Sequence, residues 1–194
     1  MASISTENNG TSDPGIDAAF FLQDLSGGGA EKIMTSLANE FARRGLRVDF
    51  VLVQATGVNL KFLSENVRVV DLRSPNTYLS LPALMRYLNQ TRPRVFLSSL
   101  DLTNLMALIA RKITRVNTRL VIRIENMESS QKRSYIKKKL EKILLSALYP
   151  WADAIVAISK NVAEDVIEYA GLSPSKIHVV FNPVVTPDLL NKAR

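Results

Sequence analysis

The chain has 194 residues, 46% of them hydrophobic, with a formal net charge of +7 and an isoelectric point near 9.8. This length and apolar content suffice for one well-filled domain, and no apolar run approaches the roughly 20 residues of a membrane-spanning helix. The absence of cysteine excludes a disulfide framework and fits a reducing compartment, while the positive charge favours an anionic partner such as nucleic acid, a phosphorylated ligand or an acidic lipid.

Residues 1–15 are polar and lack the basic and apolar regions of a signal peptide, so they are predicted to be a disordered leader. Beyond them, short apolar runs alternate with segments of helical spacing. Strands are predicted at 18–23, 47–53, 67–72, 94–98, 119–125, 154–158 and 177–181. Helices are predicted at 30–44, 81–90, 102–113, 133–148 and 161–170. The segment 55–66, between the second and third strands, is too short to assign.

Strands that alternate with helices indicate right-handed βαβ units, and several of these strands are apolar throughout, as expected where both faces are covered. The sequence therefore predicts an α/β fold, Rossmann-like and doubly wound, with a mostly parallel sheet of about seven strands. In such a sheet, ligands bind beyond the carboxyl ends of the strands, near the reversal in strand order. Polar residues follow several predicted strands: Ser98, Ser99, Asp101, Glu125, Asn126, Ser159 and Asn182. For Asp101 and Ser159, a helix N-cap is the favoured role.

Three consecutive glycines, Gly27, Gly28 and Gly29, separate the first predicted strand from the first predicted helix. This arrangement places unpaired backbone N–H groups at the positive end of a helix dipole, which favours anions. The run does not match the dinucleotide pattern G-x-G-x-x-G, because Lys32 occupies the sixth position, and it lacks the Gly-Lys-Ser/Thr ending of a P-loop. No acidic residue ends the second strand either, so an NAD-dependent oxidoreductase is disfavoured. A ligand loop and a tight turn both remain open.

The run from Glu125 to Glu128 follows the fifth predicted strand without Gly or Pro and carries two carboxylates. No helix is obviously capped by Glu125, so this residue is a candidate functional group. The one histidine, His178, lies in an apolar run, which argues against histidine catalysis and a histidine-bound metal. No metal site is predicted.

One segment is strongly basic and contains Lys132, Arg133, Lys137, Lys138, Lys139 and Lys142. On a helix, the apolar residues Tyr135, Ile136, Leu140, Ile143, Leu144, Ala147 and Leu148 form one stripe. A basic amphipathic helix can lie on an anionic membrane surface, where each Lys contributes about 1 kcal/mol. The alternative is a core-facing helix with a solvated basic face, which the local sequence favours slightly. Nucleic acid is not expected as a partner, because no aromatic platform or known motif accompanies the lysines.

Three runs resemble one known family. Residues 27–32, GGGAEK, resemble the GGGAE-plus-basic signature near the start of family 4 retaining glycosyltransferases, which have the GT-B fold. Residues 151–159, WADAIVAIS, look like the family's ADAIVAVS strand, and residues 171–184, GLSPSKIHVVFNPV, are similar to the GLPPEKIHVIYNPV that closes its N-terminal domain. Separated matches in the expected order are more specific than any one alone. The resemblance extends from residue 18 to about residue 187.

The resemblance implies an N-terminal, acceptor-side glycosyltransferase domain at 16–187, followed at 188–194 by a truncated crossover to a missing donor-binding domain. The whole enzyme is expected to transfer a hexose, with retention, from a nucleotide-sugar to a saccharide or lipid-linked acceptor in polysaccharide biosynthesis. No obligatory cofactor is expected. The chain alone is expected to be inactive without a donor domain in cis or in trans, and to be cytoplasmic, peripheral at the inner face of the membrane. The alternative is a non-catalytic Rossmann-like binding module that acts through its basic face or a partner subunit.

The resemblance also implies roles for individual residues. The three glycines correspond to the loop that approaches the donor diphosphate and the transferred sugar. Arg123, Glu125 and Asn126 look like the family's R-x-H-N or R-x-E-N variant, with Glu125 where many members have a histidine; a carboxylate is able to accept hydrogen bonds from acceptor hydroxyls. These three, with Ser99 and Asp101, are the acceptor-binding candidates. Retaining transfer is thought to use the leaving phosphate as base, so no catalytic residue is assigned. The six basic residues become membrane-contact candidates, because several family members glycosylate lipid-linked acceptors.

Overall fold

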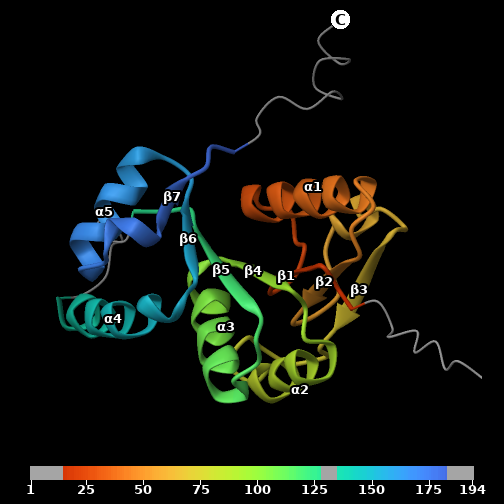
Figure 1. The fold of residues 1–194 in the computed structure, drawn as a ribbon, viewed down its shortest axis with the longest axis horizontal. Helices are drawn as coiled ribbons and strands as arrows, with labels where there is room; N and C mark the ends of the chain where they lie inside the picture. Colours follow the sequence, from red (N-terminus) through yellow and green to blue (C-terminus); the bar gives the residue numbers. More distant parts are fainter. Residues whose placement is uncertain (1–14, 128–134, 183–194) are drawn as a thin grey trace, which may run out of the picture.

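The computed structural model describes residues 15–127 and 135–182, which form a seven-stranded sheet with helices on both faces (Figure 1). The strands are β1 Ala18–Leu22, β2 Val48–Leu52, β3 Val67–Asp71, β4 Val95–Ser99, β5 Arg119–Ile124, β6 Ala154–Ala157 and β7 Ile177–Val179. The helices are α1 Gly29–Arg43, α2 Leu81–Thr91, α3 Asp101–Thr114, α4 Tyr135–Leu148 and α5 Lys160–Ala170. Short 3₁₀ turns lie at η1 Leu60–Phe62, η2 Tyr149–Trp151 and η3 Pro174–Lys176.

Neighbouring strands all run parallel, in the order β3-β2-β1-β4-β5-β6-β7. The order reverses between β1 and β4, where Phe21 lies beside Ser98. This is a doubly wound α/β sheet, so the predicted fold class is confirmed. The connection from β2 to β3, which the sequence left unassigned, contains the turn η1 in place of an α-helix.

Strand β1 is apolar and buried at all five positions because both faces of the sheet are covered there. In β1, Ala18, Phe20 and Leu22 face a core built with α1, whereas Ala19 and Phe21 belong to the core on the other face. The second core is larger and includes residues of α2, α3, α4 and α5. Figure 1 shows α1 over one face of the sheet and α2 with α3 over the opposite one. This two-sided burial positions the loops at the carboxyl ends of the strands.

The helix starts agree with the sequence in one case and differ in another. Ser159 is the N-cap of α5, and its hydroxyl accepts a hydrogen bond from the N–H of Val162 across 3.2 Å. Asp101 was expected to be an N-cap but is the first residue of α3, and Leu100 stands at the N-cap position with φ 76°. The expectation for Asp101 is therefore wrong. Its carboxylate lies in the first helical turn, where negative charge complements the helix dipole.

Candidate functional site

Three of the sequence candidates meet at the carboxyl ends of β4 and β5. Ser99 ends β4 and pairs in register with Arg123 of β5, and Glu125 follows β5 directly. The Ser99 hydroxyl donates a hydrogen bond to Oε1 of Glu125 across 2.5 Å. The guanidinium Nη1 of Arg123 donates to Ser99 Oγ across 3.0 Å and also to Oε1 of Glu125. This cluster lies beside the point where the strand order reverses, the usual ligand position in such a sheet.

Arg123 is the charged centre of the cluster and is only 3% exposed. Its Nη2 donates to Oδ1 of Asn182, beyond the end of β7, across 2.6 Å. Burial lowers the pKa of the Arg123 guanidinium below its ordinary value, and the charge and hydrogen bond of Glu125 oppose that change. A guanidinium remains protonated at neutral pH, so the site pairs one buried cation with one carboxylate.

Glu125 presents its two carboxylate oxygens differently. The donors from Ser99 and Arg123 both reach Oε1. Within residues 15–127 and 135–182, the structure gives Oε2 no hydrogen-bond partner, and the side chain keeps 15% of its surface exposed. A carboxylate held by one oxygen has a fixed orientation and retains free lone pairs on the other. Glu125 is therefore arranged to accept a hydrogen bond from a molecule bound at this edge.

The first turn of α3 braces the cluster from behind. Thr103 donates its hydroxyl to the carbonyl oxygen of Ser99 and, across 2.9 Å, to that of Leu100. Asn104 donates from Nδ2 to the carbonyl oxygen of Arg123 across 3.0 Å. The positive φ of Leu100 is uncommon for a residue with a Cβ and turns the chain sharply between β4 and α3. Thr103 and Asn104 could not be predicted as part of this cluster, because two polar residues in a first helical turn carry no specific signal.

The two other acceptor candidates are neighbours of the cluster in the sequence. Asp101 is half-buried at the start of α3, and Asn126 is exposed directly after Glu125. Asn182 belongs to the hydrogen-bond network through Arg123. From the sequence it is only a polar residue that follows a predicted strand. The roles of all these residues as acceptor ligands remain predictions.

The glycine loop lies at the N-terminus of α1, after β1. Gly28 is the N-cap and Gly29 the first helical residue, and both are exposed. Gly28 brings no side chain to cap the first N–H groups, which suits an anion at this helix end. A Cβ at Gly28 would meet the carboxylate of Glu31, whereas a Cβ at Gly29 would meet nothing within 4 Å. Gly29 therefore opens onto free space, as the predicted close approach of a ligand requires.

A further glycine, in the stretch that the sequence left unassigned, holds this loop in place. Gly57 has φ +113°, and a Cβ there would collide with the backbone of Leu25. Two backbone hydrogen bonds join the same segments, from Leu25 to Thr56 across 2.9 Å and from Asn59 to Leu25 across 3.0 Å. Gly27 also needs a left-handed conformation, with φ +121°, and lies against Val58. The β2–β3 loop thus determines the path of the glycine loop.

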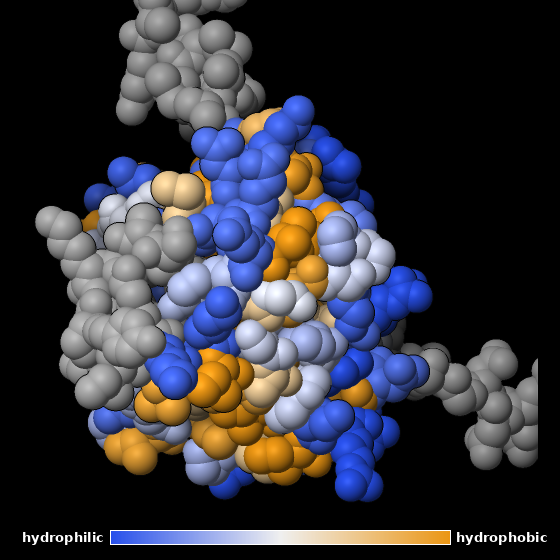
Figure 2. All heavy atoms as spheres, turned by 90° about the vertical axis from the view of Figure 1, so that its left-hand side faces the viewer, coloured by the Kyte–Doolittle hydropathy of each residue, from blue (hydrophilic) through white to orange (hydrophobic). Residues whose placement is uncertain are grey.

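The basic segment coincides with α4, in which Lys139 and Lys142 are exposed. Lys132 and Arg133 lie outside the described residues, as do the side chains of Lys137 and Lys138. The apolar stripe does not face the core as one unit. Leu145 and Leu148 are buried, but three apolar side chains point outward, with Leu140 68%, Ile143 59% and Leu144 42% exposed. Figure 2 shows the face of the molecule that carries α4 and α5, with the larger group of hydrophobic residues in its lower half and a smaller one in its upper half.

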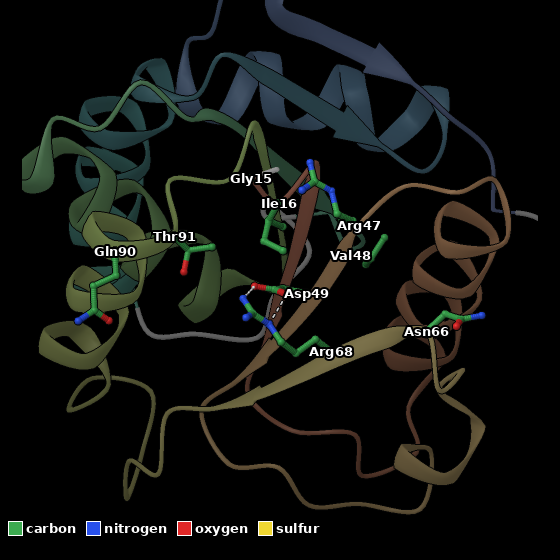
Figure 3. A pocket seen from close by; sticks show the side chains of 9 residues that line it. All are labelled: Gly15, Ile16, Arg47, Val48, Asp49, Asn66, Arg68, Gln90 and Thr91. Carbon is green, nitrogen blue, oxygen red and sulfur yellow. Dashed lines mark hydrogen bonds and ion pairs between the residues drawn. The ribbon is translucent and has the colours of Figure 1, made fainter. Parts of the chain in front are cut away.

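A hollow of about 640 Å³ lies at the opposite, amino edge of the sheet (Figure 3). In its wall, the fully buried Asp49 accepts a bidentate pair from Arg68 at 2.8 and 2.7 Å and a hydrogen bond from Tyr87 Oη across 2.7 Å. The last two residues of α2, Gln90 and Thr91, also line it. The Arg68 guanidinium is paired with the Asp49 carboxylate, and the C-terminal end of α2, with its negative dipole, lines the same hollow. We interpret these contacts as structural, because they join β2 to β3 and to α2.

Solved structures resemble this fold. The lipopolysaccharide outer core galactosyltransferase WaaB, in its apo form, superposes with a TM-score of 0.66 at 18% identity over 87% of this chain and 46% of its own. Anabaena HepE, solved with UDP, gives 0.65 at 18% identity over 92% of this chain and 49% of its own. The fold is thus the Rossmann-like domain that these GT-B structures share. The chain belongs to Glycosyltransferase Family 4, whose family model matches residues 27–187.

Two curated relatives come from Campylobacter jejuni subsp. jejuni serotype O:2. One is the N-acetylgalactosamine-N,N'-diacetylbacillosaminyl-diphospho-undecaprenol 4-alpha-N-acetylgalactosaminyltransferase, 29% identical over 89% of this chain and 49% of its own length. The other is a GalNAc-alpha-(1->4)-GalNAc-alpha-(1->3)-diNAcBac-PP-undecaprenol alpha-1,4-N-acetyl-D-galactosaminyltransferase, 28% identical over 74% of this chain and 40% of its own length. This chain spans half or less of each. The recognition of family 4 and the assignment to glycosyltransferases are confirmed.

No helix in residues 15–127 and 135–182 is both long and apolar enough to cross a bilayer. In the same ranges, no three His, Asp or Glu side chains stand close enough together to hold a metal ion.

Proposed function

We propose that this chain is the acceptor-binding half of a retaining glycosyltransferase. The whole enzyme transfers a hexose or N-acetylhexosamine from a nucleotide-sugar to a saccharide carried on a polyprenyl diphosphate. The observation that carries the proposal is the position of Glu125 beside the strand reversal, at the end of β5, where it is held through Oε1 with Oε2 free of partners among the described residues. The curated relatives, whose names specify diphospho-undecaprenol acceptors, support the class of acceptor.

In this proposal, Oε2 of Glu125 accepts a hydrogen bond from a non-reacting hydroxyl of the acceptor sugar, which orients the neighbouring, reacting hydroxyl toward the donor. The hydrogen bonds from Arg123 and Ser99 fix the position and the plane of the carboxylate. Because the carboxylate is already fixed, the hydroxyl that it orients loses little further entropy on reaching the transition state. The reacting hydroxyl oxygen forms a bond to the anomeric carbon as the bond from that carbon to the donor phosphate breaks, and the leaving phosphate takes the hydroxyl proton, so no protein base is needed.

The donor diphosphate approaches the N-terminus of α1 in this proposal. Gly29 is exposed with free space beside it, and the first N–H groups of α1 are not capped by a side chain of Gly28. Most of the nucleotide-sugar contacts come from a second, donor-binding half. The chain alone is therefore inactive.

The exposed face of α4 contacts an anionic membrane surface in this proposal. Leu140, Ile143 and Leu144 provide apolar area, and the exposed Lys139 and Lys142 provide positive charge beside it. Such a face suits the boundary between lipid headgroups and acyl chains. A peripheral position at the membrane would bring the acceptor site to a lipid-linked substrate.

The proposal is tested by comparing the purified chain with the same chain joined to the donor-binding half of the Campylobacter N-acetylgalactosaminyltransferase. We expect no transfer from UDP-N-acetylgalactosamine by the chain alone, and transfer to an undecaprenyl-diphosphate-linked saccharide by the joined protein. In the joined protein, Glu125→Ala should lower the rate by orders of magnitude while Asn161→Ala, an exposed change on α5, leaves it unchanged. Turnover by the chain alone, or full activity of Glu125→Ala, would contradict the proposal.

A further inference from the structure

One buried guanidinium connects Glu125 to the end of the described chain. Arg123 donates from Nη1 to Glu125 and from Nη2 to Oδ1 of Asn182, the latter across 2.6 Å. Residues 123 and 182 are 59 positions apart and come from β5 and from the segment beyond β7. The two contacts use different nitrogens of one planar group, so they are geometrically linked.

Burial makes this link stiff. Arg123 is 3% exposed, so water has little access to replace either of its partners. A guanidinium in such surroundings loses much of its solvation, which makes each remaining hydrogen bond costly to break. The Arg123 backbone is also held, because its carbonyl oxygen accepts from Asn104 and its strand pairs with β4 and β6. A displacement at Asn182 is therefore transmitted to the carboxylate rather than absorbed by a mobile side chain.

Asn182 occupies the place where the chain leaves the sheet. The last backbone hydrogen bond that ties this end to the sheet, within the described residues, runs from Val180 N to Ala157 O across 3.0 Å. The next side chain, Phe181, is 67% exposed. The contact between Asn182 and Arg123 then sets the direction of the chain beyond β7.

We propose that Arg123 is a positioning residue that couples the orientation of Glu125 to the direction in which the chain leaves the sheet at Asn182. The inference rests on the proposed function, because it takes Glu125 as the acceptor-binding carboxylate. Binding of an acceptor to Glu125 favours the exit direction in which Asn182 contacts Arg123. By reciprocity, a fixed exit direction favours acceptor binding.

The link is tested first without any ligand, by amide hydrogen exchange of the 194-residue chain. Asn182→Ala should accelerate exchange by about threefold or more at the end of β5, and Glu125→Gln should do the same at residues 177–182. Asn182→Asp keeps a side-chain oxygen for Arg123 and should restore slow exchange at β5. Asn161→Ala is the control and should change neither segment. If Asn182→Ala leaves the end of β5 unaffected, or Asn182→Asp fails to restore it, the coupling is wrong whatever the function.

A second measurement adds an acceptor probe, methyl α-N-acetylgalactosaminide, to the same exchange experiment. In the wild-type chain, the probe should slow exchange at residues 177–182; in Asn182→Ala it should slow exchange near Glu125 only. Equal protection of the exit segment in both proteins would overturn the coupling but leave the proposed function intact. Failure of the probe to bind the wild-type chain would instead contradict the acceptor site, and with it the acceptor-linked form of the coupling.

Discussion

The hydroxyl of Ser99 donates a hydrogen bond to Oε1 of Glu125 across 2.5 Å. The residues are 26 positions apart in sequence but end neighbouring strands of the sheet. A hydroxyl has one proton and two lone pairs, so Ser99 can donate to Glu125 while it accepts from Arg123 across 3.0 Å. Ser99 thus determines which way the carboxylate plane faces, and Arg123 supplies its charge balance.

Replacing Ser99 by alanine should leave the chain folded but disorient Glu125. Loss of a hydrogen bond to a charged group should cost about 1–2 kcal/mol, or a fall of a few degrees in the unfolding temperature. Affinity for methyl α-N-acetylgalactosaminide should fall by about tenfold, equivalent to about 1.4 kcal/mol. Thermal unfolding and a binding titration by NMR, both on the 194-residue chain, provide the two measurements.

The neighbouring serine offers a matched control. Ser98 is equally buried, and the structure gives its hydroxyl no hydrogen-bond partner among the described residues. Ser98→Ala removes the same atom from the same strand and should be neutral or slightly stabilising, with unchanged affinity. Equal losses of affinity in Ser98→Ala and Ser99→Ala would refute the assigned role of Ser99.

The fold could be predicted because its signals are local. Continuous apolar runs such as Phe20 to Leu22 indicate strands covered on both faces, and Gly171 ends α5 in the left-handed conformation typical of a helix C-terminus. The N-cap at Asp101 was mispredicted because Leu100 adopts a positive φ, which residue type alone does not indicate. No secondary structure could be assigned to the β2–β3 connection, because it contains no segment with helical or strand periodicity.

The candidate site was predictable only in part. Strand ends locate Ser99 and Glu125, since parallel strands bring their carboxyl ends to one edge of the sheet. No local pattern reveals that Arg123 reaches Asn182, because that contact depends on packing between β5 and the end of β7. The exposure of the Leu140 side chain could not be predicted either, because a stripe of apolar residues on a helix does not show which of them contact the core.

Tyr87 should make the fold sensitive to alkali. Burial, followed by the charge and hydrogen bond of Asp49, holds the pKa of the Tyr87 phenol far above its ordinary 10.0. The folded protein therefore keeps a proton that the unfolded chain loses above pH 10. This contribution to stability is complete below pH 10 and falls above it, by up to about 1.4 kcal/mol per pH unit. Urea unfolding at pH 8, 10 and 11 measures the decline.

The effect belongs to Tyr87 only if a matched variant removes it. Tyr87→Phe should lower stability at pH 8 by about 1–2 kcal/mol, because buried Asp49 loses a donor, and should show a shallower decline above pH 10. Tyr78→Phe changes a tyrosine that is 65% exposed and should reproduce the wild-type profile. A decline in Tyr87→Phe as steep as in the wild type would rule out the buried phenol as its source.

The α4 face should bind anionic vesicles in a salt-dependent way. Neutralising two surface lysines with Lys139→Gln and Lys142→Gln should weaken binding by about 2 kcal/mol, or roughly thirtyfold, since each contributes about 1 kcal/mol. Sedimentation with phosphatidylglycerol-containing and pure phosphatidylcholine vesicles, at low and high salt, tests this. Salt should release the protein, because screening acts on exposed charges.

A charge control separates this face from the general basicity of the chain. Lys61→Gln combined with Lys32→Gln removes two exposed lysines from α1 and the β2–β3 loop, away from α4. That pair should lose far less binding than the α4 pair. Equal binding to both kinds of vesicle, or equal losses in the two double variants, would leave α4 as a solvated helix face.

The glycine loop should separate function from folding at adjacent positions. Gly29 has open space around a would-be Cβ and no positive φ, so Gly29→Val should shift the free energy of unfolding by about 1 kcal/mol or less. Gly27→Ala forces a Cβ into φ +121° at 3.1 Å from Val58, and Gly57→Ala drives one into the Leu25 backbone. Both of these should lower the unfolding temperature clearly, and Gly57→Ala more so.

In the chain joined to a donor-binding half, the transfer rate should be strongly sensitive to substitution at Gly29, although stability is least sensitive there. The valine methyls at Gly29 project into the space proposed for the donor diphosphate and sugar, so the rate should drop by orders of magnitude while the melting temperature moves by only a few degrees. Unfolding and transfer are to be measured on the same preparation. If Gly29→Val unfolds the protein, the glycine serves the turn. If Gly29→Val folds and transfers normally, the loop does not face the donor, and the binding role proposed for the N-terminus of α1 is wrong.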